Sequence, residues 1–260
     1  MLAADSHVVR NETGLLAFLD RRKIVVDPDA PGAAAALLRE GRRVLLCIEN
    51  TQLYACGRAL EAGELGHLRD LHGQADGRLG LHLDGSRLFN AWARERYDLV
   101  RDLDFVESIS LSLNKGLAAP IGALLVGGPE LIEACNAQAL AEARIVRPAH
   151  VPAAYGLAAL RLTLPGIADD NRRAGYVACA LLATLEGSGL RVEYGGTNIV
   201  FLSGFVGEEA AAFVAAAAEA DLLVRVFRDP STVRLVFHRD IDDAAAERVP
   251  EVICRLVAGR

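Results

Sequence analysis

The chain has 260 residues, 52% of them hydrophobic, and a formal net charge of -6. This length is enough for one large domain, or for one large domain and one small one. The acidic balance argues against a nucleic-acid partner, and no uncharged apolar run approaches the ~20 residues of a transmembrane helix. The opening segment MLAADSHVVRN has no basic stretch followed by an apolar one, so we expect a cytoplasmic protein without a secretory signal. The scattered cysteines form no CxxC pair and predict no metal site.

The first part of the chain alternates short Val-, Ile- and Leu-rich runs with longer helical patterns. This rhythm is typical of an α/β fold, a mostly parallel sheet with helices on both faces. The predicted strands cover 44–48, 79–84, 104–112 and 121–126, and the predicted helices cover 32–41, 61–74, 87–96 and 129–144.

The alternation of single strand and helix patterns ends at Pro165. A long helix over 167–188 precedes short strands at 190–194, 197–202, 222–227 and 232–238, with helices at 208–219 and 242–257. We therefore predict a large domain over 1–165 and a small C-terminal α+β domain over 166–260.

An aspartate and a lysine follow two of the predicted strands. Asp84 ends the strand at 79–84, and Lys115 lies in a Gly-flanked bend after the strand at 104–112. Ligands of open α/β sheets gather at such strand ends, and an apolar bend is expected to desolvate the amine and lower its pKa. A deprotonated lysine forms imines, and an aspartate can keep a pyridine nitrogen protonated, which suits pyridoxal phosphate. A solvated loop lysine and a helix N-cap aspartate are the competing interpretation.

The residues around this pair resemble a known family. HLDGSRLFNA (82–91) and SLNKGLAAPIGALLVG (112–127) are similar to stretches of the threonine aldolase family of fold-type-I pyridoxal-phosphate enzymes. The similarity extends over most of the chain, with further matching segments at 5–8, 12–14, 48–51, 196–200 and 233–238.

The resemblance implies roles for individual residues in cofactor binding. Lys115 would form the Schiff base, Asp84 would pair with the pyridine nitrogen, and Arg87 would contact the phenolic oxygen or the substrate. His7 would stack on the ring, unless it is an ordinary surface histidine near the N-terminus. Arg147 would reach a phosphate, in some family members across a dimer interface.

The resemblance also implies a reaction and an assembly. Arg234 would grip the α-carboxylate of an amino acid with its guanidinium fork, unless it is an exposed strand arginine. The expected reaction cleaves the Cα–Cβ bond of a β-hydroxy amino acid to glycine and an aldehyde. Because fold-type-I sites lie at a two-fold interface, a homodimer or homotetramer is expected.

Several positions depart from the family pattern. Gln52 replaces a histidine, Asn114 replaces the serine before the lysine, and 143–146 lacks the glycines that precede Arg147. No Ser-Gly-Thr loop that would cradle the cofactor phosphate stands before Asp5, so we expect weakened cofactor affinity. Two alternatives stay open: another pyridoxal-phosphate reaction, such as β-elimination or racemisation, and a truncated, inactive homologue with a dimerisation role.

Overall fold

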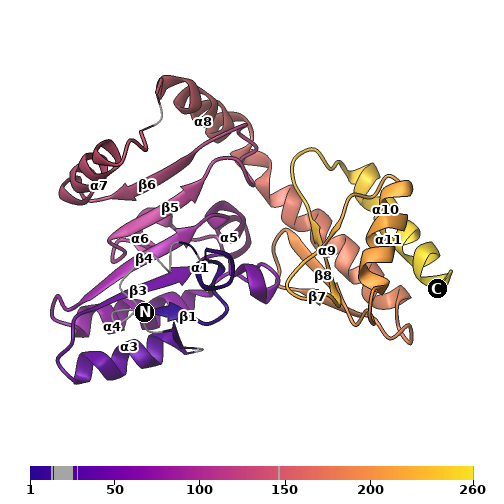
Figure 1. Cartoon of the computed structure of the whole chain (residues 1–260), viewed down its shortest axis with the longest axis horizontal. Helices are drawn as coiled ribbons and strands as arrows, with labels where there is room; N and C mark the ends of the chain where they lie inside the picture. The colour runs from indigo at the N-terminus through magenta and orange to yellow at the C-terminus, as the bar shows by residue number, and fades with distance from the viewer. Residues whose placement is uncertain (13, 15–25, 28, 146, 260) are drawn as a thin grey trace.

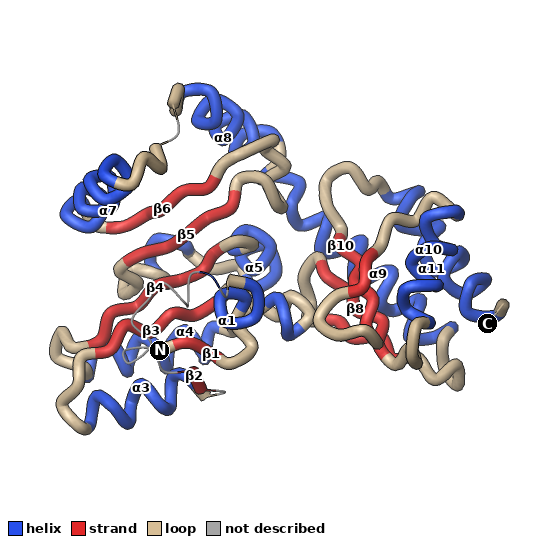
Figure 2. Tube along the Cα trace, in the orientation of Figure 1, coloured by secondary structure: helices blue, strands red, loops and turns tan. Residues whose placement is uncertain are grey.

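The computed structural model describes residues 1–12, 14, 26–27, 29–145 and 147–259 (Figure 1). Thr13 and Val146, which fall in segments named in the sequence analysis, lie outside the described residues, as does Lys23, the second lysine of the chain. The described chain forms two sheets, and the long helix α9 (Ile167–Thr184) leads from one to the other (Figures 1 and 2).

The first sheet has six strands in the order β2-β1-β3-β4-β5-β6. All neighbouring pairs are parallel except β5 with β6. Side chains alternate between faces along each strand, and in β4 every second residue, from Leu79 to Gly85, is buried. The prediction of a mostly parallel α/β sheet is confirmed. The strands are β1 (Leu2–Ala3), β2 (Val26–Asp27), β3 (Val44–Glu49), β4 (Leu79–Gly85), β5 (Ser108–Ser112) and β6 (Ala123–Gly127).

Some of the helices around this sheet begin at polar caps that the sequence encodes. Asp29 accepts the backbone N–H of Gly32 at the start of α3, and Glu61 and Glu64 form a capping box at the start of α4. Leu65 and Leu68 of α4 pack into the core under the sheet. The elements are α1 (His7–Asn11), α3 (Ala30–Arg39), α4 (Ala62–Gln74), α5 (Leu88–Glu95), α6 (Leu99–Asp102), α7 (Pro129–Ala141) and α8 (His150–Leu162), with the short 3₁₀ helices η2 (Leu53–Ala55) and η3 (Leu164–Gly166).

The second sheet has four antiparallel strands in the order β7-β8-β10-β9. Every residue of β8 is buried. Val200 and Leu202 belong to the apolar core with α9, α10 and α11, whereas Ile199 and Phe201 pack with Leu53 and Cys56. The elements are β7 (Arg191–Tyr194), β8 (Ile199–Ser203), β9 (Arg225–Val226), β10 (Thr232–Val236), α10 (Glu209–Glu219) and α11 (Asp243–Ala258).

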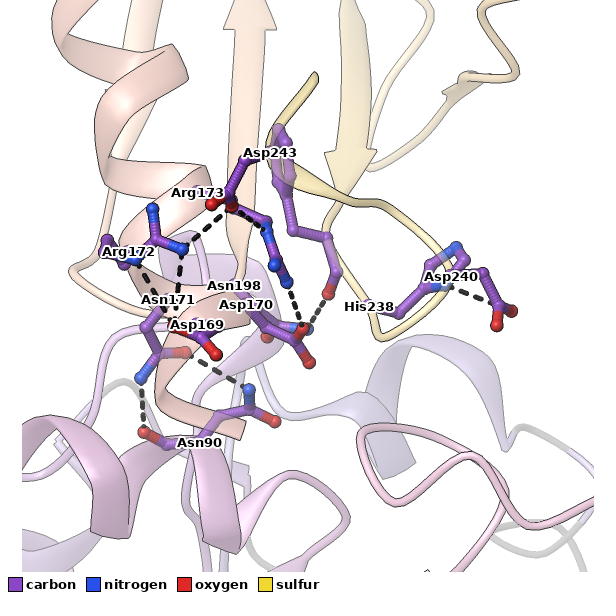
Figure 3. Close-up of polar contacts among 11 residues, drawn as sticks. Asn90, Asp169, Asp170, Asn171, Arg172, Arg173, Asn198, His238, Asp240 and Asp243 are labelled. Atoms are coloured by element: carbon purple, nitrogen blue, oxygen red, sulfur yellow. Dashed lines mark hydrogen bonds and ion pairs between the residues drawn. The ribbon is translucent and has the colours of Figure 1, made fainter. Parts of the chain in front are cut away.

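Polar side chains join the two sheets (Figure 3). Asn90 of α5 and Asn171 of α9 exchange hydrogen bonds of 3.1 and 2.9 Å. The hydroxyl of Thr197 donates to the carbonyl of Gly57 over 2.5 Å. A Cβ added at Gly195 would lie 2.6 Å from the backbone nitrogen of Arg58, so only glycine fits this approach. The boundary between 1–165 and 166–260 stays a prediction.

Some predicted boundaries were wrong. The strand predicted at 104–112 begins only at Ser108, because Leu103 and Phe105 enter the core from the preceding turn. The helix predicted to reach 144 ends at Ala141, and Ala143 takes a left-handed conformation with φ of 55°. Helix α8 was not predicted; it buries only Gly156 and Ala159, but its sequence HVPAAYGLAALRL is apolar on most sides, so no separate polar face marked it as an amphipathic helix.

Strand β6 and the helices after it expose apolar side chains. Leu124, Leu125 and Val126 of β6 are between 41% and 48% exposed, and α7 buries no residue. Among the described residues, no single helix is long and apolar enough to cross a membrane. Helix α8 and the stretch Leu164–Thr184, bent by 42° against each other, pass that test together by length and composition.

Candidate functional site

The carboxyl ends of the parallel strands bring the predicted site residues together. Asp84 lies at the end of β4, and Lys115 follows β5, its neighbour in the sheet. The Lys115 amine interacts electrostatically with Arg87, Asp84, Glu49 and Arg234. Arg234 comes from β10 in the second sheet, so the cluster lies where the two sheets meet.

The amine of Lys115 has the electrostatic surroundings expected of an imine-forming lysine. Burial lowers its pKa, and Arg87 lowers it further, whereas Asp84 and Glu49 raise it. The residue as a whole keeps an exposed surface, so its amine is surrounded by protein yet reachable from solvent. Gly116 follows it because a Cβ there would lie 2.7 Å from Oδ1 of Asn90.

Asp84 is held in place by the backbone. Its Oδ1 accepts the N–H of Ser86 over 3.0 Å, and in the sheet it is paired with Glu49 of β3 and Ser110 of β5. Since residues paired in register share a face, the carboxylates of Asp84 and Glu49 lie on the same side of the sheet.

Two partly buried guanidinium groups carry unsatisfied donors. The Nε atoms of Arg87 and Arg234 are buried without a hydrogen-bond partner in the described part of the chain. Burial lowers the pKa of Arg87 to about 10, and Arg234 lowers it too, with Asp84 opposing both. The Arg234 guanidinium lies over the Phe227 ring, 4.2 Å from its centroid. Because buried donors are normally satisfied, this arrangement favours a bound anion.

Glu49 belongs to the matching segment 48–51, but the sequence analysis gave it no role of its own. Its carboxylate accepts the backbone N–H of His7. Burial, with smaller contributions from Asp84 and Asp5, raises its pKa to about 7 against the opposing effect of the His7 hydrogen bond. The signal was available: Glu49 ends a strand as Asp84 does, but the predicted strand stopped one residue short of it.

His7 begins α1 at the edge of this cluster. Ser6 caps the helix by accepting the N–H of Val9, and the Nε2 of His7 lies 3.7 Å from Glu12. Its Nδ1 is buried with no partner among the residues described.

Arg147 is not part of the cluster. It lies exposed in the loop between α7 and α8. The resemblance-based role for Arg147 therefore stays a prediction that the geometry of this one chain does not support.

The side chain of Gln52 is part of a polar network with Arg58 and Glu64. Its Oε1 accepts from Arg58 over 3.0 Å, and Arg58 forms an ion pair of 2.7 Å with Glu64. His82 likewise has a structural partner, since its Nδ1 lies 2.8 Å from the Ser108 hydroxyl. Within the described ranges, no group of His, Cys, Asp or Glu is placed to hold a metal ion.

A cavity of about 440 Å³ adjoins this region beside Glu49. Polar groups from β3, the loop after it and α4 line one part of it, and the apolar side chains of Leu60, Leu68 and Leu71 line another. The polar lining residues include Asp5, Gln52, Arg58, Glu64 and His67.

The chain is similar to known proteins over most of its length. It is 30% identical over 213 residues to a probable low-specificity L-threonine aldolase 2 of Arabidopsis thaliana, covering 79% of this chain and 57% of the relative. It is 31% identical over 175 residues to the low specificity L-threonine aldolase of Escherichia coli K12, covering 67% and 49%. The chain thus spans about half the length of the curated relatives it matches.

The fold has solved counterparts. A protein from Exiguobacterium sp. 255-15, grouped with the aromatic amino acid beta-eliminating lyases and threonine aldolases, superposes with a TM-score of 0.77 at 16% identity. The alignment covers 98% of this chain and 75% of that one. The model of the beta-eliminating lyase family matches residues 1–204. The chain therefore belongs to the beta-eliminating lyase family.

Proposed function

We propose that this chain is the core of a pyridoxal-phosphate-dependent lyase of the threonine aldolase type. Its reaction would cleave the Cα–Cβ bond of a β-hydroxy amino acid to glycine and an aldehyde. The observation that carries the proposal is the cluster of Lys115, Asp84, Arg87 and Arg234 at the strand ends. The names of the curated relatives support the same reaction.

The residues of the cluster fit this cofactor and its substrate. The unpartnered Nε atoms of Arg87 and Arg234 suit the phenolic oxygen of the cofactor and the carboxylate of an amino acid. The Lys115 amine, with its lowered pKa, suits covalent attachment, and Asp84 suits a protonated ring nitrogen. His7 is proposed to pack on the ring.

Each side chain has a part in the chemistry. Bound pyridoxal phosphate supplies an electron sink for the charge left on Cα when the bond breaks. Asp84 holds a proton on the ring nitrogen. Arg234 binds the α-carboxylate and so orients the bond that breaks, while Arg87 contacts the cofactor or substrate oxygen. The carboxamide of Gln52 is too weak a base to accept a proton near neutral pH, so it cannot remove the β-hydroxyl proton.

Arg147 and assembly belong to the same proposal. Fold-type-I sites lie at two-fold interfaces, so we propose a homodimer or homotetramer. The exposed position of Arg147 is compatible with a phosphate contact made to a neighbouring subunit.

Covalent labelling tests the proposal. Pyridoxal phosphate added to the protein should give an imine absorbance band, and borohydride should fix the label on Lys115. The sequence has only one other lysine, so Lys23→Arg is the matched control and should keep the band. A label on Lys23 alone, or a band that persists in Lys115→Ala, would exclude Lys115 as the cofactor lysine.

A second pyridoxal-phosphate reaction has one observation in its favour. Gln52 stands where a histidine is expected, and Arg58 and Glu64 hold it in a network. Product analysis separates the reactions: glycine and acetaldehyde from L-threonine support the lyase, whereas exchange of the Cα hydrogen of alanine in D₂O supports racemisation. Neither product nor exchange from a labelled protein would support an inactive homologue.

A further inference from the structure

Glu49 connects the sheet to the short helix that carries His7. It is the last residue of β3, and its side-chain oxygen accepts the backbone N–H of His7, the first residue of α1. The N–H of Leu53, which opens η2, also hydrogen-bonds to this carboxylate. One side chain thus holds two segments that have little regular structure of their own against the end of β3.

Helix α1 depends on such contacts. It has five residues, none of them buried, so neither helix propensity nor a buried apolar face stabilises it. Its described tertiary contacts include the hydroxyl of Tyr54, which donates to Asn11 over 2.7 Å, and the Arg10 guanidinium over the Tyr54 ring. Those contacts act at the far end of the helix, whereas the Glu49 contact acts at His7.

The surroundings of Glu49 are strongly charged. Asp84 is its partner in the neighbouring strand, Asp5 precedes α1, and Lys115 faces it from the loop after β5. Arg58, Glu64 and His67 line the same cavity. The charge on Glu49 therefore affects both the Asp84–Lys115 pair and the position of His7.

We propose that Glu49 is a positioning residue for His7, and that its charged form holds the first turn of α1 against the end of β3. What His7 does to a cofactor rests on the proposed function, whereas the attachment of α1 to Glu49 does not. The carboxyl has a pKa of about 7, so it gains a proton as the pH falls below neutrality. A protonated carboxyl is a weaker acceptor than a carboxylate, so the attachment of His7 weakens at the same pH.

Hydrogen–deuterium exchange on the protein without cofactor tests the attachment. Glu49→Ala removes the acceptor and should speed exchange in the segment 7–11 by about tenfold at pH 8, the effect of losing one charge-assisted hydrogen bond. Glu49→Gln keeps an uncharged acceptor and should exchange at an intermediate rate, with no difference between pH 6 and pH 8 after correction for intrinsic rates. Unchanged exchange in Glu49→Ala would overturn the proposal.

Glu107→Gln is the matched control. The Glu107 carboxylate also accepts a backbone N–H, that of Leu81, but elsewhere on the sheet. The Glu107→Gln variant should therefore leave hydrogen–deuterium exchange in the segment 7–11 unchanged. Equal acceleration in both variants would overturn the proposal, because it would indicate general loosening.

Cofactor binding gives the second measurement. The ratio of the wild-type affinity for pyridoxal phosphate to that of Glu49→Gln should change around pH 7, the pKa of Glu49, because the titration of the cofactor and of Lys115 is common to both proteins and cancels in the ratio. A ratio that does not change between pH 6 and pH 8 would overturn the coupling. If the exchange results hold while no cofactor binds, the proposed function fails and the attachment of α1 to Glu49 stands. If cofactor binds and exchange is unchanged in Glu49→Ala, the positioning role fails alone.

Discussion

Asp170, at the start of α9, is a buried carboxyl that costs stability at neutral pH. Its side chain is 3% exposed and lies 3.8 Å from Arg173, which is shared with Asp243 (Figure 3). Burial raises its pKa from 3.8 to about 6, and Asp169 raises it as well, whereas Arg173, His238 and Arg239 oppose the shift without cancelling it. The folded protein therefore holds this proton more tightly than the unfolded chain does.

The sign and size of the effect follow from linkage. Below pH 3.8 both states hold the proton and the group has no effect; from there to about pH 6 the folded state holds more protons, so stability falls as the pH rises. Above pH 6 the free energy of unfolding stays lower by about 3 kcal/mol, which follows from the pKa shift at ~1.36 kcal/mol per pKa unit. Asp170→Asn stays neutral at every pH, so its free energy of unfolding should exceed that of the wild type by up to about 3 kcal/mol at pH 7.

Urea unfolding at intervals from pH 4 to pH 8 measures this difference. The gap between variant and wild type should open between pH 4 and pH 6 and then stay constant. Asp169→Asn is the control: this carboxyl is 51% exposed and pairs with Arg172 at the surface, so its replacement should change stability by less than about 1 kcal/mol. If Asp170→Asn were less stable than the wild type at pH 7, the attraction of Arg173 would outweigh burial and the reasoning would be wrong.

Three further predictions concern ligand binding and assembly. Arg234→Gln should lower kcat/KM for an amino-acid substrate by about a hundredfold, because two charge-assisted hydrogen bonds are lost, whereas Arg191→Gln at the exposed start of the edge strand β7 should have little effect; equal losses would contradict a carboxylate contact. Pyridoxal phosphate should bind more tightly than phosphate-free pyridoxal in a titration, and Arg147→Gln should reduce the difference, because the exposed Arg147 is proposed to contact the phosphate of a neighbouring subunit; equal affinities of the two forms would refute this contact. Light scattering should detect at least a dimer, since β6 exposes Leu124, Leu125 and Val126, and a stable monomer at micromolar concentration would count against it.

The sequence was most informative where a strand ends in a polar residue. Asp84 and Lys115 were chosen because they follow predicted strands, and the structure does bring their side chains into one cluster. Parallel strands place their carboxyl ends at one edge of a sheet, so the prediction required only the strand order, not side-chain detail. Arg234 lies 119 positions after Lys115 in the numbering, and only the family resemblance connected the two.

Contacts between backbone and side chain were harder to predict. Nothing in the local sequence indicates that Glu49 reaches His7, because the two are 42 positions apart and β1 is only two residues long. Gln52 appeared as a missing histidine, yet it takes part in a network with Arg58 and Glu64 that depends on how the loop after β3 folds. Helix α8 was missed for a different reason: its residues are mostly apolar, so its sequence lacks the alternation of polar and apolar faces that marks an amphipathic helix.

The charges of the site make its empty form unfavourable and favour the binding of an anion. Lys115, Arg87 and Arg234 face Asp84 and Glu49, and the carboxyl of Glu49 has a pKa of about 7, so it is only partly charged at neutral pH. Positive charge therefore exceeds negative charge, and burial, followed by the charge of Arg234, lowers the pKa of Arg87. Such a site is costly to fold empty, because like charges repel and two buried Nε donors lack partners among the described residues. An anionic ligand removes both costs, so binding and folding are coupled: a ligand at a hundred times its Kd adds about 2.7 kcal/mol to stability. The benefit of this arrangement is preorganisation: guanidinium groups that are already in position do not have to move when the ligand binds.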